Sequence, residues 1–275
     1  NVKTLQGMQY HKSMSDKINK RLAYVDEMKQ GMVNNDFRLY YQPQYNHNGD
    51  MCGAEALLRW LHPIHGMESP AVYIPIAEES NLILVIGQWV LEQACRDIYQ
   101  LEQQGLPKNF KKIAVNVSAK QLIQHDFQEK ILSTIKQYDI SSKYLSLELT
   151  ENLLVENIEH TIELISDLKA KKIDCAIDDF GTGYSSLTYL KRIPASVLKI
   201  DRSFVTNIDK SKDSAAIASM IISLAKTLNM KVLAEGVETQ EELDCLKSLG
   251  CYDYQGFYFS KPVPFDEFVT LLAKS

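Results

Sequence analysis

Several features that define common protein classes are missing from this chain of 275 residues. No dense run of Lys or Arg is present and the formal net charge is −5, which argues against binding to long nucleic acid, where many phosphates must be neutralised. The net charge does not argue against a small anionic ligand in a locally positive pocket. The longest apolar run, near "NLILVIGQWVL", is interrupted by Gly87 and Gln88. It is shorter than the roughly 20 residues that a helix needs to span a bilayer.

Cysteine and histidine are too scattered to indicate a metal centre. The five cysteines include no C-x-x-C pair and the six histidines show no H-x-x-x-H spacing. We therefore predict reduced thiols in a cytoplasmic domain and no zinc site built on these residues. The chain starts at Asn1 rather than Met, so we expect it to be part of a longer protein, which could be tethered to a membrane upstream.

Residues 1–36 differ from the rest of the chain. They are polar and rich in Lys, and they carry a modest apolar stripe at helical spacing. The stripe consists of Met14, Ile18, Leu22, Val25 and Met28. We predict a helix that serves either as a linker from an upstream domain or as a helix packed on the domain formed by residues 37–275.

After residue 36, short strand-like segments alternate with longer helical ones. The predicted strands are 37–45, 51–60, 112–118, 144–150, 173–178, 197–201, 231–237 and 252–259. The predicted helices include 88–104, 128–138, 158–170, 214–228 and 240–249. This alternation indicates βαβ units and a parallel sheet, and eight strands in about 250 residues predict an α/β fold of the TIM type, a (β/α)8 barrel.

One connection does not fit a fully parallel barrel. The first two strands are separated only by "NHNGD", in which Asn48-Gly49 is a typical hairpin turn. A parallel crossover needs a dozen or more residues. We therefore predict that the first strand runs antiparallel to the others.

Polar residues fall near the carboxyl ends of the predicted parallel strands, where barrel enzymes place their active sites. They are Glu55, Asn116, Glu148, Asp178, Asp179, Lys199, Asp201, Glu235 and Gln255. Carboxylates and amides without His or Cys form a hard oxygen ligand set, which favours Mg²⁺ or Mn²⁺. Cations beside Asp178 and Asp179 would make two adjacent ionised carboxylates tolerable, and a carboxylate that bridges two metals is the arrangement that cleaves phosphodiesters.

Two other chemistries are disfavoured. Lys199 could be the nucleophile of a Schiff-base aldolase, but the surrounding carboxylates would raise its pKa and keep it charged. The stretch "DDFGTGYSS" lacks the G-x-x-x-x-G-K-[ST] spacing of a phosphate-binding loop. Its glycines instead predict a tight, mobile turn that could gate the site.

The ordered set of motifs resembles the EAL domain, the bacterial cyclic-di-GMP phosphodiesterase family. The signature itself is "GAEALLRW" (53–60). The other motifs are "YYQP" (40–43), "NVS" (116–118), "LELTE" (147–151), "DDFGTGYSSL" (178–187), "LKID" (198–201), "AEGVET" (234–239) and "QGFYFSKP" (255–262). The resemblance covers roughly Phe37 to the C-terminus.

This resemblance implies hydrolysis of cyclic-di-GMP to linear pGpG with two Mg²⁺ or Mn²⁺ ions. It implies that Glu55, Asn116, Glu148 and Asp178 bind the first metal, and that Asp178, Asp179, Glu235 and Gln255 form the second site. Lys199 would hold the attacking water or hydroxide, which makes Glu55, Lys199 and Glu235 the catalytic residues. Gln42, Arg59 and Asp201 would line the nucleotide groove, and Glu151 would anchor the Asp178-Asp179 loop.

The resemblance also implies partners and an alternative function. Family members often work as homodimers in which the "DDFGTGYSS" loop is coupled to the dimer contact. Many are attached to a diguanylate cyclase-like (GGDEF) domain, so we expect an upstream GGDEF or sensory domain. Some members have lost catalysis and act only as cyclic-di-GMP receptors or protein-contact modules. Tyr252, Asn81 and Phe257 depart from common family residues, but none is an expected metal ligand. Because every expected catalytic position is filled by a competent residue, we predict an active enzyme.

Overall fold

The computed structural model describes residues 2–155, 157–183 and 186–275. It divides into two compact units. The smaller unit comprises residues 1–38 and 58–86, and the larger, here called the barrel unit, comprises residues 39–57 and 87–275. The predicted boundary at residue 36 remains a prediction, because the division into units follows packing and splits the first two strands.

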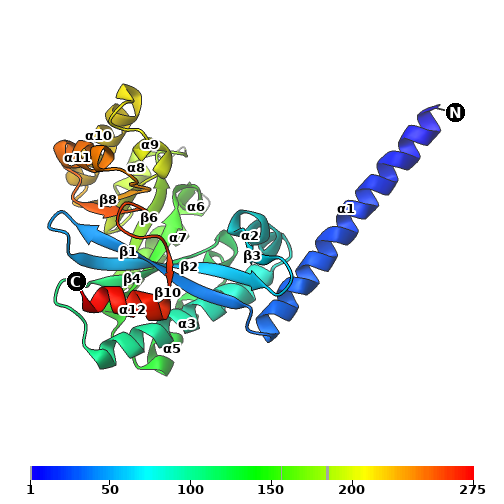
Figure 1. The fold of residues 1–275 in the computed structure, drawn as a ribbon, viewed down its shortest axis with the longest axis horizontal. Coiled ribbons are helices and arrows are strands. Elements are labelled where there is room, and N and C mark those ends of the chain that lie inside the picture. Colours follow the sequence, from blue (N-terminus) through cyan, green and yellow to red (C-terminus); the bar gives the residue numbers. More distant parts are fainter. Residues whose placement is uncertain (1, 156, 184–185) are drawn as a thin grey trace. The chain divides into compact units, whose positions relative to one another are not determined.

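Eight strands pair in a closed ring that forms the barrel, and Figure 1 labels several of them. The strands are β1 (Phe37–Asn46), β2 (Met51–His62), β4 (Lys112–Asn116), β5 (Leu145–Thr150), β6 (Asp174–Phe180), β7 (Val197–Ile200), β8 (Lys231–Glu235) and β9 (Asp253–Gln255). Each pairing from β2 round to β9 is parallel, whereas β1 pairs antiparallel with β9 and also pairs with β2 to close the ring. The TIM-type barrel with an antiparallel first strand is confirmed.

Helices follow the strands of the barrel in the predicted alternation. The longer ones are α3 (Leu82–Gln104), α5 (Phe127–Tyr138), α7 (Ile158–Ala170), α10 (Lys212–Thr227) and α11 (Gln240–Leu249). Helix α10 buries Ala218, Ile221, Ile222 and Ala225, positions that share one face of a helix. The side chain of Ser211 caps its first turn by accepting a hydrogen bond from the amide of Ser214.

Several short elements were not predicted from the sequence. In the barrel unit they are α4 (Ala119–Leu122), η1 (Ser142–Tyr144), α6 (Glu151–Val155), α8 (Leu187–Leu190), α9 (Arg202–Val205), β10 (Val263–Pro264) and α12 (Phe265–Ala273). The smaller unit adds β3 (Gly66–Glu68) and α2 (Pro70–Glu79). Within the described part of the chain, no single helix has the length and apolarity to cross a membrane, and only α2 and α3 counted together reach that threshold.

The smaller unit is organised around Trp60. This buried ring stacks on Phe37 with centroids 5.4 Å apart and meets the edges of Tyr24 and Tyr73 at 5.2 and 5.7 Å. Tyr24 belongs to α1 (Val2–Val33), the helix predicted in this region. The apolar stripe of α1 divides along its length, because Met28 is buried whereas Met14, Ile18 and Leu22 are more than half exposed.

A buried carboxylate in the barrel unit makes stability depend on pH. Asp97 on α3 accepts hydrogen bonds from the Tyr41 hydroxyl at 2.5 Å and from the Gln93 amide at 2.9 Å. Burial nevertheless raises the pKa of Asp97 from 3.8 to about 6. The folded state therefore keeps a proton between pH 4 and 6 that the unfolded chain has released, so the free energy of unfolding falls as the pH rises through this window.

We expect Asp97→Asn to remove this dependence. Relative to the wild type, the variant should gain up to about 3 kcal/mol in the free energy of unfolding between pH 4 and pH 7. Urea unfolding at pH 4, 5, 6 and 7 measures the difference. Asp167→Asn, at an exposed site on α7, is the matched control and should show a constant difference. If the free energies of unfolding of Asp97→Asn and the wild type differed by the same amount at every pH, Asp97 would not be the source of the pH dependence.

Candidate active site

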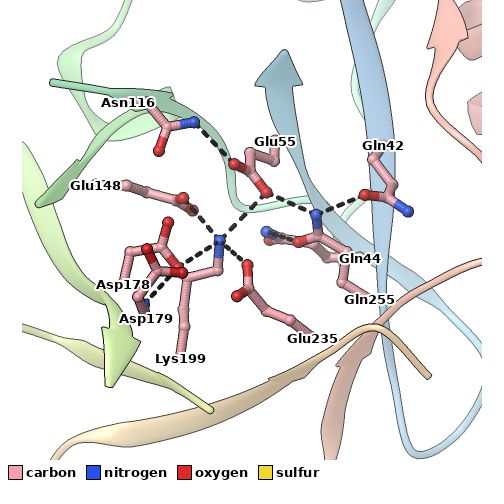
Figure 2. A network of polar contacts seen from close by, with 10 residues as sticks. All are labelled: Gln42, Gln44, Glu55, Asn116, Glu148, Asp178, Asp179, Lys199, Glu235 and Gln255. Carbon is pink, nitrogen blue, oxygen red and sulfur yellow. Dashed lines mark hydrogen bonds and ion pairs between the residues drawn. The ribbon is translucent and has the colours of Figure 1, made fainter. Parts of the chain in front are cut away.

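A polar cluster lies inside the barrel unit, near the carboxyl ends of the parallel strands (Figure 2). Side chains two residues apart in a strand share a face, and the register of the sheet places these inward positions side by side. Asn116 on β4 is the register partner of Glu148 on β5, and Glu235 on β8 is the register partner of Gln255 on β9. The layer therefore follows from strand alternation and register.

Lys199, at the centre of this layer, contacts four carboxylates. Its Nζ lies 2.7 Å from Glu148 Oε2, 2.7 Å from Glu235 Oε1, 3.2 Å from Glu55 Oε2 and 3.6 Å from Asp178 Oδ1. The side chain is only 1% exposed. Burial opposes the positive charge, but the carboxylates, Glu148 foremost, outweigh burial and raise the pKa of Lys199 well above its usual range. Lys199 is thus a permanently charged ammonium, which is the opposite of what a Schiff-base nucleophile requires.

Glu55 is held in its ionised form by donors on several sides. Asn116 Nδ2 donates to Oε1 at 2.8 Å, and Gln255 Nε2 donates to Oε2 at 2.6 Å. Burial works against ionisation, but the Lys199 ammonium and these two amides together keep the pKa of Glu55 below its ordinary value. Glu55 is therefore a fixed negative charge.

Glu148 and Glu235 behave differently from Glu55. Burial, together with the charge of Glu55, raises the pKa of Glu148 well above its ordinary range. Burial also raises the pKa of Glu235 to about 8, although Lys199 partly offsets this increase. The cluster thus contains more negative charge than one ammonium can balance, so it retains protons until another cation is present.

A bulge in β6 explains how two adjacent aspartates reach one site. Neighbouring residues in a regular strand point to opposite faces, but the β6–β7 register shifts between Ile177 and Phe180. Asp179 adopts a left-handed backbone conformation with φ of 53°, a conformation that Asp and Asn tolerate better than most residues. As a result, Asp178, Asp179 and Glu235 each bring an oxygen within 4.8 Å of one another. Burial, and then the charge of Asp178, raises the pKa of Asp179 to about 6.

Glu151 is connected to the loop that follows the two aspartates. This buried carboxylate accepts hydrogen bonds at Oε2 from the amides of Gly181 at 3.0 Å and Gly183 at 2.9 Å. Gly181 has φ of +100°, and a Cβ atom there would lie 2.7 Å from the Phe204 ring. A side chain at this position would therefore be disfavoured both by the backbone conformation and by a clash with Phe204. The contacts support the predicted anchoring role of Glu151. Two residues of the predicted mobile turn, Tyr184 and Ser185, lie outside the described residues.

A chain of glutamines borders the cluster on one side (Figure 2). Gln255 Nε2 donates to Gln42 Oε1 at 2.9 Å, and Gln255 Oε1 accepts from Gln44 Nε2 at 2.9 Å. Sequence reasoning missed Gln44. The period-2 alternation of β1 would have revealed it, because residues 42 and 44 must face the same side.

The remaining predicted groove residues are placed differently. Asp201 caps α9 by accepting a hydrogen bond from the amide of Ser203 at 2.7 Å. Its charge and a hydrogen bond with Asp179 also raise the pKa of Asp179, so Asp201 borders the cluster. Arg59 belongs to the smaller unit, and its role at the nucleotide groove remains a prediction.

The donor set fits divalent cations that prefer oxygen ligands. Two triads of carboxylates each bring oxygens within 4.8 Å of one another, Glu55 with Glu148 and Asp178, and Asp178 with Asp179 and Glu235. Asp178 is common to both. All the contributing atoms are hard oxygen donors, the type that Mg²⁺ and Mn²⁺ select.

Fold and site together define a class of protein: a (β/α) barrel with one reversed strand and a buried acidic cluster at the carboxyl ends of its strands. The sequence pattern of the EAL domain family matches residues 25–262. The chain belongs to the EAL domain family. The match begins inside α1, about one helical turn before Met28, and so extends further towards the N-terminus than the motifs alone indicated.

Two relatives from Pseudomonas aeruginosa share this domain. The chain is 39% identical over 265 residues to the bifunctional diguanylate cyclase/cyclic di-GMP phosphodiesterase MucR of Pseudomonas aeruginosa, covering 96% of this chain and 38% of MucR. It is 38% identical over 244 residues to the cyclic di-GMP phosphodiesterase NbdA of the same organism, covering 88% of this chain and 31% of NbdA. A solved structure of the PaMucR phosphodiesterase in complex with c-di-GMP superimposes with a TM-score of 0.85 at 40% identity, covering 89% of this chain and 98% of that one. The chain spans well under half of the length of MucR and NbdA.

Proposed function

We propose that this chain is a phosphodiesterase that hydrolyses one phosphodiester bond of cyclic-di-GMP to give linear pGpG. The observation that carries the proposal is a cluster of five carboxylates, four of which lie within 3.6 Å of the buried Lys199 Nζ. A receptor that only binds the dinucleotide has no use for so much buried, partly uncompensated charge. The names of MucR and NbdA and the c-di-GMP complex of PaMucR support the choice of substrate.

The charge of the cluster supports two divalent cations. Five ionised carboxylates and one ammonium carry a formal charge of −4, which two such ions would neutralise. We propose that Glu55, Asn116, Glu148 and Asp178 hold one ion, and that Asp178, Asp179 and Glu235, with Gln255, hold the other. Bound there, Mg²⁺ or Mn²⁺ would supply Lewis-acid polarisation of the scissile phosphate and positive charge near the attacking water.

The other side chains of the site have separate proposed roles. Lys199 stays charged and can donate hydrogen bonds to the attacking water, which fixes its position. Glu235 lies on the same side of the cluster, with its Oε1 2.7 Å from Lys199 Nζ, so we propose that this carboxylate takes a proton from that water. Gln42 and Asp201 border the cluster, and with Arg59 we propose that they contact the nucleotide.

Purified protein incubated with Mg²⁺ and cyclic-di-GMP tests the proposal. We expect chromatography to show pGpG as the product, and EDTA to stop its formation. Tight binding of cyclic-di-GMP without formation of pGpG would show that the chain is a receptor and not an enzyme. Neither binding nor turnover would overturn both functions.

Asp179→Asn separates the two cation sites. Asparagine tolerates the left-handed backbone at this position, so the bulge should persist while one ligand charge is lost. We expect turnover to fall on the order of 100-fold and cyclic-di-GMP affinity to change by less than about threefold. Calorimetric titration in Ca²⁺ and steady-state turnover in Mg²⁺ measure the two quantities. An equal loss in both would show that Asp178 and Asp179 do not have divided roles.

The wider setting is also proposed. Because the chain spans only 38% of MucR, a protein named as both cyclase and phosphodiesterase, we propose an upstream GGDEF or sensory domain in a longer protein. We propose a cytoplasmic location for this domain and a homodimer linked through the loop after Asp179. Sedimentation of the purified chain with and without cyclic-di-GMP tests the dimer.

A further inference from the structure

A cavity opens at the end of the barrel opposite the acidic cluster. Its volume is about 740 Å³, within the range of roughly 300–1,000 Å³ typical of small-molecule sites. The lining comes from residues at the amino ends of the parallel strands, and its inner wall includes Glu148 and Lys199. All of it belongs to the barrel unit.

Small side chains create this space. A TIM-type barrel normally fills its interior with layers of bulky branched residues. Here, the positions two residues before Asn116, Glu148 and Asp178 are Ala114, Ser146 and Ala176, and all three line the cavity. The strand alternation that points the acidic cluster inward therefore also points three small residues inward, one layer below.

The mouth of the cavity is strongly basic, although the chain as a whole carries a net charge of −5. Six lysines line it: Lys108, Lys111, Lys112, Lys143, Lys169 and Lys231. Asp174 and Asp253 are the acidic residues of the mouth, and Asp174 already pairs with Lys112 at 3.7 Å. Among the described residues, the other five lysines have no carboxylate within ion-pair distance. This excess charge suits a ligand that carries several negative charges.

A buried hydroxyl inside the cavity lacks a partner. Ser146 is 0% exposed and lines the cavity, and its Oγ has no hydrogen-bond partner among the described residues. A buried polar group left unpaired costs free energy, so it marks a position where a ligand atom would be stabilised. The two parts of the cavity therefore suit different parts of a ligand. The interior suits an uncharged polar group, and the mouth suits anionic groups.

We propose that this cavity is a second ligand site, which binds an organic polyphosphate of the nucleoside polyphosphate type. The phosphates contact the lysines of the mouth, and the uncharged part enters beside Ala114 and Ala176, where it hydrogen-bonds Ser146. This site is separate from the proposed phosphodiester-cleaving site and does not depend on that function. It shares only the wall formed by Gln44, Glu148 and Lys199.

Calorimetric titration in EDTA tests the proposal, with ATP, tripolyphosphate and adenosine as probes. We expect ATP to bind more tightly than either of the others. The triple variant Lys143→Gln/Lys169→Gln/Lys231→Gln should weaken ATP and tripolyphosphate binding about tenfold. Ser146→Val should weaken ATP binding several-fold and leave tripolyphosphate binding unchanged, because only the nucleoside reaches the hydroxyl.

A charge-matched control distinguishes the site from diffuse attraction. Lys191→Gln/Lys210→Gln/Lys226→Gln removes the same charge at exposed positions that do not line the cavity and should leave ATP binding unchanged. Thermal unfolding of each variant confirms that it is folded. Absence of ATP binding, an equal loss in both triple variants, or no effect of the mouth variant would overturn the proposal. Tripolyphosphate binding as tightly as ATP would overturn the nucleoside part.

Discussion

Lys199→Met is expected to destabilise the protein by about 3–5 kcal/mol in EDTA, because it leaves a group of buried carboxylates without their cation. Four carboxylate oxygens lie within 3.6 Å of Lys199 Nζ, and the side chain is enclosed. Part of the cost is relieved when the carboxylates take up protons, so the destabilisation should be larger at pH 8 than at pH 5. Turnover should fall by more than about 100-fold, because the ammonium proposed to hold the attacking water is lost.

Divalent cations should partly reverse this destabilisation. Ions that bind the folded state stabilise it by mass action, and the variant has more uncompensated charge for them to neutralise. Urea unfolding in EDTA measures the destabilisation caused by the substitution, and urea unfolding in Mg²⁺ measures how far the cation reverses it. Lys210→Met, at an exposed site, is the control. We expect Mg²⁺ to stabilise Lys199→Met more than the wild type. A variant as stable as the wild type in EDTA would show that Lys199 does not balance the cluster.

Glu55→Gln is expected to abolish turnover while the barrel stays folded. The substitution preserves the size of the side chain but replaces a fixed negative charge with an amide. Outer-shell residues of metal sites typically contribute about 10–100-fold to affinity or activity, so if Glu55 is a direct ligand, as proposed, its loss should cost more than about 100-fold. Asn116, Gln255 and Lys199 all donate to the carboxylate of Glu55, and at least one of them would then face an amide nitrogen.

The control is Glu241→Gln, which makes the same carboxyl-to-amide change at an exposed position in the first turn of α11. Comparing the two variants separates the effect of losing the Glu55 charge from the general effect of the substitution. Product formation, Mn²⁺ affinity and thermal unfolding should be measured on both variants. We expect Glu55→Gln to lose product formation and weaken Mn²⁺ binding, and to unfold in a cooperative thermal transition, which shows that the barrel is folded. Full turnover in Glu55→Gln would remove Glu55 from the proposed ligand set.

The barrel could be predicted because its signals are local and repeated. Alternating strand and helix patterns gave the eight strands, and Asn48-Gly49 gave the reversed first strand. Strands β3 and β10 were missed because two or three residues are too few to show a period. The short helices α4, α6, α8 and α9 were missed for the same reason, since four or five residues complete little more than one turn.

The site was harder to predict than the fold. Alternation alone places only one of Asp178 and Asp179 inside the barrel, and the bulge that turns both inward arises from the pairing of β6 with β7, which the sequence of β6 does not show. The pKa of Glu235 depends on burial and on three partners from other strands. The cavity beneath the cluster depends on small residues, Ala114, Ser146 and Ala176, which carry no signal until the register places them side by side.

The left-handed residue at Asp179 has a consequence for how this domain can diverge. The bulge consists of Asp178 and Asp179, which lie opposite Lys199 between the register pairs of Ile177 and Phe180, so deleting one of the two would restore regular alternation in β6 and leave one inward aspartate. Such a deletion would dismantle the triad with Glu235 and leave the triad with Glu55 and Glu148 in place. If the two triads hold cations as proposed, a single codon therefore separates a domain with two cation sites from a domain with one.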